Sequence, residues 1–136
     1  MSKALERLIT IAGLLIAILA ALLSGLLELF FTPLRVHGVL IGVSILMALV
    51  INPAIGWFAV NTTGRRGAVA APWLLWTALM LLASGYRTPE GDYLVAGNDW
   101  VALVMILVGS LGYAVFAYRM ILTRRASIVP SRRPTL

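Results

Sequence analysis

The chain has no cysteine, only one histidine and few charged residues. Without cysteine it cannot form a disulfide, a lipoprotein anchor, a thiolate metal site or an iron–sulfur cluster. With His37 as its single histidine, the chain alone cannot ligate a haem from both sides. The sequence shows no cluster of histidine with carboxylates, no serine paired with a histidine and no glycine-rich phosphate loop. We therefore expect neither an enzyme nor a bound cofactor.

Charged side chains make up 12% of the chain, whereas 61% of its residues are hydrophobic and the mean hydropathy is +0.98. Soluble domains carry about 25% charged residues, and a chain of 136 residues cannot bury this much apolar surface. We therefore predict a single-domain integral membrane protein. Its net charge of +6 comes from basic residues near the ends of the apolar segments. We expect these residues to orient the chain in the membrane and not to bind nucleic acid.

Long apolar segments predict an all-α, integral membrane four-helix bundle. The expected helices cover residues of about 8–31, 36–60, 68–85 and 99–122. The first segment is too long for the apolar core of a signal peptide, so we expect it to be retained. Thr32-Pro33 should end the first helix, and a short connection to about Arg35 makes the second helix antiparallel to it. Residues 1–122 then form one transmembrane domain, and residues 123–136 form a basic cytoplasmic tail that is expected to be disordered.

The basic residues predict which ends of the helices face the cytosol. With both termini cytosolic, the inner segments carry Lys3, Arg7, Arg65, Arg66, Arg119, Arg124, Arg125, Arg132 and Arg133. The outer segments then carry only Arg35 and Arg87. This positive-inside bias predicts an N-in, C-in topology. The clustered Arg119, Arg124 and Arg125 are expected to contact anionic lipid headgroups on the cytosolic side.

Small residues recur at intervals of four along the first segment, at Gly13, Ala17, Ala21 and Gly25. This pattern produces a smooth face that another membrane helix can approach closely. The second segment contains the pair Gly38 and Gly42, and the last segment contains Gly109 and Gly112. We interpret these glycines as further helix contacts. Because one compact bundle does not need so many small-residue faces, they indicate packing against other membrane proteins.

Apart from His37 and Asp99, at the beginning of the second and last predicted helices, Glu28 is the only acidic or basic residue within a predicted helix away from the cytosolic ends. It continues the small-residue face and lies close to the outer end of the first helix. In one interpretation, it forms a polar cluster at the outer face with Arg35, His37 and Arg87, through an ion pair or a hydrogen bond. In the other, a lone buried carboxylate serves as a proton-coupling site. The shallow depth and the nearby basic residues favour the first.

The second predicted helix contains the pair Asn52-Pro53. Pro53 should kink the second helix, and Asn52 either marks a hinge or a substrate path, or hydrogen-bonds the carbonyls that the kink frees. We favour hydrogen bonding, because membrane helices tolerate proline through such local repair.

Trp57, Trp73 and Trp76 are expected to lie at one membrane interface as an aromatic belt.

Two stretches of the second half, residues 71–74 (Ala-Pro-Trp-Leu) and 87–93 (Arg-Thr-Pro-Glu-Gly-Asp-Tyr), precede a glycine-containing last helix. They resemble an uncharacterised family of small actinobacterial four-helix membrane proteins, which carries an Arg-Pro-Glu-Gly-Asp motif in its outer loop. Thr88 interrupts that motif here. The resemblance implies an actinobacterial plasma membrane location and no established activity.

The sequence favours a non-enzymatic accessory or scaffolding subunit, for example in a respiratory or envelope complex of a bacterial plasma membrane. Its expected partners are other integral membrane proteins and anionic lipids, and a homo-oligomer is a further option. The alternative is a small oligomeric ion-coupled transporter that uses Glu28. The small multidrug transporters also have four helices and a glutamate in the first. Their glutamate belongs near the middle of its helix, however, and the strong charge bias here opposes the dual orientation that they need.

Overall fold

A computed structural model describes residues 1–95 and 97–128, with side chains described as far as Thr123. This part contains the helices α1 (Lys3–Phe31), α2 (Val43–Thr63), α3 (Ala70–Gly85) and α4 (Trp100–Ile128). Its other elements are the strands β1 (Arg35–Val36) and β2 (Val39–Leu40) and the 3-10 helix η1 (Arg66–Val69). Because helices make up 77% of the described part of the chain, the fold is the all-α four-helix bundle that the sequence predicts.

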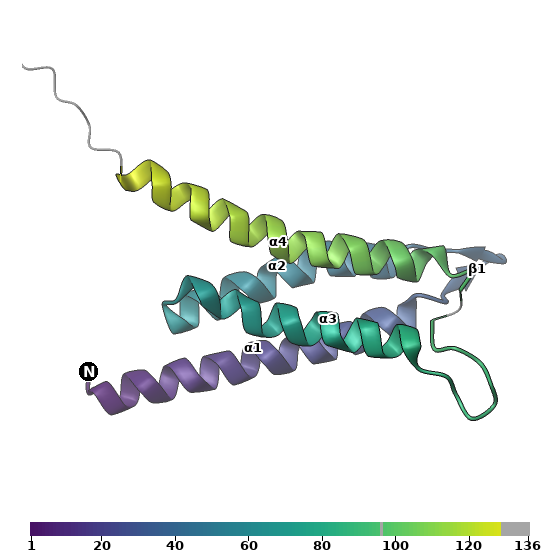
Figure 1. Ribbon diagram of the computed structural model, residues 1–136, viewed down its shortest axis with the longest axis horizontal. Helices are drawn as coiled ribbons and strands as arrows, with labels where there is room; N and C mark the ends of the chain where they lie inside the picture. The colour runs from purple at the N-terminus through teal and green to yellow at the C-terminus, as the bar shows by residue number, and fades with distance from the viewer. Residues whose placement is uncertain (96, 129–136) are drawn as a thin grey trace, which may run out of the picture.

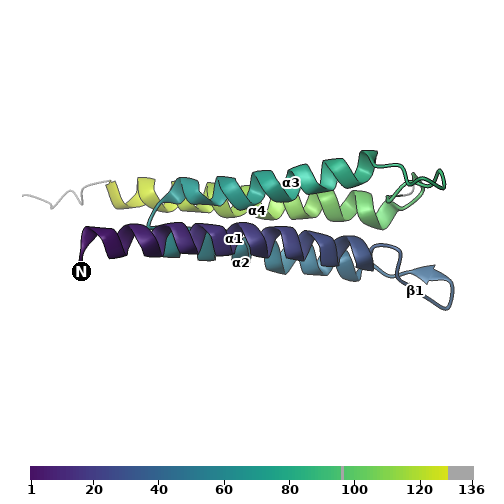
Figure 2. The same ribbon diagram turned by 90° about the horizontal axis from the view of Figure 1, so that it is seen from below.

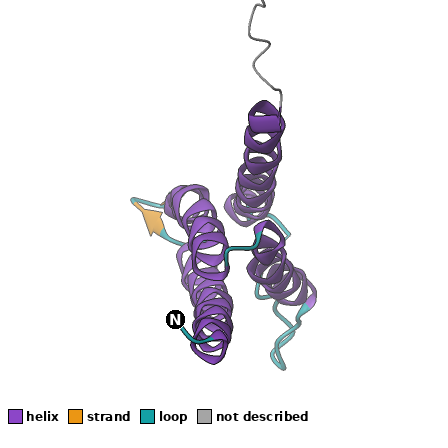
Figure 3. Cartoon of the chain, turned by 90° about the vertical axis from the view of Figure 1, so that its left-hand side faces the viewer, coloured by secondary structure: helices purple, strands orange, loops and turns teal. Residues whose placement is uncertain are grey.

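The helices form two layers, α1 with α2 and α3 with α4 (Figure 1 and Figure 2). Helix α1 packs against α2 and α3, and α2 packs against α4, whereas α3 and α4 approach each other much less closely. The end-on view shows this separation between α3 and α4 (Figure 3). The N-terminus and the C-terminal end of α4 lie at one end of the bundle, and the strands lie at the other (Figure 1). The arrangement therefore alternates as a four-span topology requires.

All four helical segments are long and apolar enough to cross a membrane. Many large apolar side chains on the outer helix faces are exposed, among them Leu15, Leu19, Leu23, Leu46, Val50, Leu74, Leu82, Leu103 and Leu107. Water would penalise such a surface at about 25 cal/mol per Å², whereas hydrocarbon does not. The molecule therefore has the surface of a multi-pass membrane protein.

The connection between α1 and α2 differs from the prediction, because α2 begins at Val43 and not near residue 36. Instead, β1 and β2 form an antiparallel hairpin in which Val36 pairs with Val39. The two turn residues, His37 and Gly38, both have positive φ angles, of 51° and 83°. Such a turn matches the twist of a two-residue hairpin and favours glycine. The residues on both sides of this turn are apolar and continue into α2, so the sequence predicts the start of a helix here, although the valines favour a strand.

The ends of the first and last helices also lie beyond their predicted positions. Helix α1 begins at Lys3, where the Ser2 hydroxyl accepts a hydrogen bond from the Leu5 N–H. Helix α4 begins after Asp99, whose carboxylate accepts one from the Ala102 N–H. It continues to Ile128, so the expected tail is helical over its first residues. Residues 129–136 lie outside the described part of the chain.

Candidate functional site

The small-residue face of α1 is used within the chain itself. Gly13, Ala17, Ala21 and Gly25 are all buried. A Cβ atom on Gly13 would overlap the side chain of Thr62 in α2, and one on Gly25 would lie 2.8 Å from Leu79 in α3. The close approach of α1 to its two neighbours therefore requires these glycines.

The other predicted packing glycines differ in their roles. A Cβ atom on Gly109 would overlap the ring of Trp76, and one on Gly112 would lie 3.4 Å from Pro53, so both glycines lie at the contacts of α4. Gly38 lies in the hairpin turn with nothing within 4 Å of a Cβ position, and Gly42 precedes α2 and faces only Ile45 of its own segment. The pair Gly38 and Gly42 therefore forms no helix contact.

Glu28 lies on the same face of α1 and is fully buried, with an exposed fraction of 0%. Its Oε2 atom accepts a hydrogen bond of 2.9 Å from the indole Nε1–H of Trp76 in α3. Its Oε1 atom has no hydrogen-bond partner among the described residues. The carboxyl group thus has one donor where an ionised carboxylate accepts several.

The basic residues expected beside Glu28 lie elsewhere. Arg35 and His37 are exposed in the hairpin. Arg87 donates from Nε to the Gly91 carbonyl at 3.0 Å, and its guanidinium carbon lies 5.7 Å from the centre of the Tyr93 ring. Hence the structure does not bring together the predicted outer-face cluster. All three side chains are exposed, whereas Glu28 is buried.

Trp76 is the residue that the sequence interpretation misplaced. It was expected in an interfacial belt, but it is fully buried, whereas Trp57 is 59% exposed. An indole N–H that is buried needs an acceptor, and Glu28 was the available intramembrane acceptor. The two residues are 48 positions apart, so no local pattern linked them.

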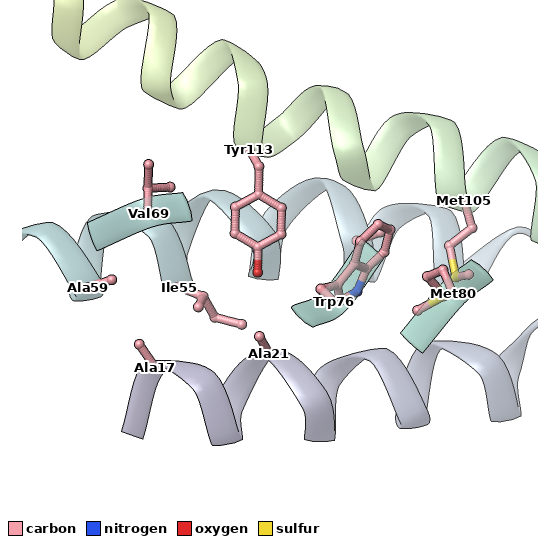
Figure 4. Close-up of a cluster of buried hydrophobic side chains, with 10 residues drawn as sticks. Ala17, Ala21, Ile55, Ala59, Val69, Trp76, Met80, Met105 and Tyr113 are labelled. Atoms are coloured by element: carbon pink, nitrogen blue, oxygen red, sulfur yellow. The ribbon is translucent and has the colours of Figure 1, made fainter. Parts of the chain in front are cut away.

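The Trp76 ring also connects α3 to α4 across the wide gap between these helices. Its centre lies 6.2 Å from that of Tyr113, with an angle of 58° between the planes, and Trp73 stacks on Tyr113 at 6.4 Å. Trp73 also donates from Nε1 to the Ser110 hydroxyl at 3.2 Å. Figure 4 shows Tyr113 pointing from α4 toward α1, on the side of Ala21. Here large aromatic rings fill the space between α3 and α4, whereas along α1 small residues let the helices approach closely.

Other buried polar side-chain atoms belong to α2, α3 and α4. Those without a hydrogen-bond partner among the described residues belong to Ser44, Asn52, Thr77 and Tyr113. The Asn52 Nδ2 atom lies 2.8 Å from where a Gly109 Cβ would be, beside the Trp76 ring. Neither polar atom of the Asn52 side chain has a hydrogen-bond partner among the described residues, so the expectation that Asn52 hydrogen-bonds carbonyls beside Pro53 is wrong. Its amide points into the bundle because Gly109 leaves room for it.

We define the core polar cluster as Glu28, Trp76, Asn52 and Tyr113. Chemically, it offers a carboxyl group with a free oxygen, an amide and a hydroxyl among aromatic rings. Among the described residues, no group of three histidine, cysteine or carboxylate side chains could hold a metal ion. No protein-family model, curated protein or solved structure matches the chain.

Proposed function

We propose that the chain is a small oligomeric ion-coupled transporter of a bacterial plasma membrane, with Glu28 as its proton-binding group. One observation carries the proposal. Glu28 is fully buried in the bundle, and among the described residues Trp76 is its only hydrogen-bond donor and one of its oxygens has no partner. A carboxyl group in this setting is costly to retain, and such groups mark ion or proton pathways in membrane proteins.

The depth of the core polar cluster supports this function. Asn52, Trp76 and Gly109 lie near the midpoints of the membrane-crossing parts of their helices. Because the Glu28 Oε2 atom lies 2.9 Å from the Trp76 Nε1 atom, the carboxyl group lies at the depth of the middle of α3. A carboxyl group at that depth is where proton pathways of membrane proteins place their ionisable residues. The Asn52 amide and the Tyr113 hydroxyl have no hydrogen-bond partner among the described residues, so they remain available to form hydrogen bonds.

The small-residue faces no longer favour an accessory subunit. That interpretation depended on faces left over for other membrane proteins. In the structure, Gly13 and Gly25 contact α2 and α3, and Gly109 contacts Trp76. These glycines therefore pack against helices of the same chain and are not left over for contacts with other membrane proteins.

The test of the proposal is proton movement into vesicles that contain the purified chain. A potassium diffusion potential, inside negative, would drive protons inward, and a trapped dye would report the internal pH. We expect proton uptake several times faster than in protein-free vesicles. Glu28→Gln should reduce uptake to the protein-free rate, because an amide cannot release a proton. Glu6→Gln is the matched control, since Glu6 is exposed near the other end of α1.

Two results would contradict the proposal. One is uptake by the unaltered chain at the protein-free rate. The other is an unchanged rate in Glu28→Gln. Circular dichroism and the elution volume of each variant establish that a loss of uptake is not a loss of folding.

A second candidate function is the accessory subunit, which one other observation favours. The strand-bearing end of the bundle exposes apolar side chains outside the four helical segments that could cross a membrane: Val39 is 68% exposed and Leu94 58%. Where exposed apolar side chains form a contiguous patch, they mark partner contacts. For this candidate, Val39→Glu should abolish co-purification of a membrane partner in mild detergent while proton uptake is unchanged. Purification of the unaltered chain without any other protein would contradict it.

The proposal includes an orientation and a location. Both termini would face the cytosol, which is the orientation that the basic residues predict. The resemblance of residues 71–74 and 87–93 to an actinobacterial family supports a plasma membrane location. The resemblance and the location both stay predictions.

A further inference from the structure

A long groove lies between α2 and α4 on the surface of the bundle. Its apolar part has a volume of about 510 Å³ and is lined by residues that include Leu49, Pro53, Val108, Gly112 and Val115. Gly112 forms part of the floor, because its missing side chain leaves α4 in contact with Pro53. The groove faces outward, away from the core polar cluster.

A second hollow continues the groove toward the end of the bundle that carries the termini. It has a volume of about 490 Å³ and shares Phe116 and Arg119 with the apolar part. Arg66 and Trp57 also line it. Among the described residues that line the two hollows, none is acidic.

The two arginines are held at this end by different elements. Arg119 belongs to α4. Arg66 belongs to η1 and donates from Nη1 to the Met120 carbonyl of α4 at 2.9 Å. This bond draws the Arg66 guanidinium across to α4 and uses only one of its five N–H donors. An anion in the second hollow would thus meet two cationic groups and no opposing carboxylate.

The length of the groove matches one leaflet. From Arg119 to Val108, α4 rises by about 16 Å, at about 1.5 Å per residue. Half of a hydrocarbon core of about 30 Å is about 15 Å. Trp57, which is exposed beside the second hollow, is a residue type that favours the headgroup level.

We propose that this groove binds one anionic phospholipid, with an acyl chain along the apolar part and the phosphate between Arg66 and Arg119. The charge of the second hollow selects an anionic headgroup over a zwitterionic one. The adjoining apolar groove selects a lipid over a free anion. This site is separate from Glu28 and does not depend on the function proposed above.

The test compares thermal stabilisation of the detergent-purified chain by phosphatidylglycerol, phosphatidylcholine and inorganic phosphate. We expect phosphatidylglycerol to bind most tightly, and Arg119→Gln to weaken it about fivefold. Val115→Trp should weaken it as well, because the larger ring would fill the groove. Arg35→Gln and Leu107→Trp are matched controls, since both residues are exposed and line neither hollow.

Equal binding of phosphatidylglycerol and phosphatidylcholine would overturn the proposal. So would phosphate that stabilises the chain as much as phosphatidylglycerol, because the site would then bind a free anion. An Arg119→Gln variant that keeps the lipid preference would exclude the assigned headgroup position. Because proton uptake is measured separately, none of these results depends on Glu28.

Discussion

Trp76 holds Glu28 in the bundle core through a single hydrogen bond, and the same ring fills the gap to α4. The bond is buried and joins helices from the two layers. A buried hydrogen bond to a carboxylate contributes about 1.5–3 kcal/mol, and removing one partner leaves the other desolvated without compensation. Both the stability and the chemistry of the site therefore depend on this indole.

Trp76→Phe should lower the free energy of unfolding by about 2 kcal/mol, because it removes the N–H donor and keeps most of the ring. Reversible unfolding in mixed detergent, followed by circular dichroism, measures the change. Trp57→Phe is the control and should change stability little, since Trp57 is 59% exposed. Equal effects of the two substitutions would argue against a structural role for the Glu28 bond.

Gly109→Ala should destabilise the bundle by about 1–3 kcal/mol, since overpacking a filled core displaces its side chains. The added methyl group would overlap the Trp76 ring and lie 2.8 Å from the Asn52 amide. The same unfolding measurement applies. Gly67→Ala provides the control, because nothing lies within 4 Å of its Cβ position. A Gly109→Ala variant as stable as the unaltered chain would show that α4 does not pack closely there.

At the scale of elements, the length of the apolar segments was enough to predict the four helices. It did not predict the residues at which they begin and end, or the hairpin between α1 and α2. The residues around Val36 and Val39 are apolar, and such a short apolar stretch is compatible with either a strand or a helix. Only the paired positive φ angles at His37 and Gly38 decide between them. The small-residue face of α1 could be predicted because its residues recur every four positions within one segment. The contact between Glu28 and Trp76 was not, because it joins segments distant in sequence.

The hairpin gives a prediction at this scale. Gly38→Val should disrupt the turn, because a β-branched residue strongly disfavours a φ of 83°. Hydrogen exchange should then increase at the amides of β1 and β2 and stay unchanged in α1 and α2. Gly42→Ala is the comparison, since Gly42 lies outside the left-handed region. Loss of protection throughout the bundle would instead make the hairpin part of its cooperative core.

For the whole molecule, the charge distribution and the alternating helices imply one orientation. Because the chain has no cysteine, single cysteines at Gly67 and Gly97 report the two ends without background. An impermeant maleimide added to intact cells should label Gly97→Cys and leave Gly67→Cys unlabelled until lysis. The reverse pattern would invert the topology and move the Arg66–Arg119 hollow to the outer leaflet.

Infrared difference spectroscopy reports directly whether Glu28 exchanges a proton from inside the membrane. Spectra of the reconstituted chain recorded at successive pH values report the C=O stretch of a protonated carboxyl group. We expect a band that changes with pH, disappears in Glu28→Gln, shifts in Trp76→Phe and is retained in Glu6→Gln. Identical spectra for the unaltered chain and Glu28→Gln would contradict proton exchange by Glu28.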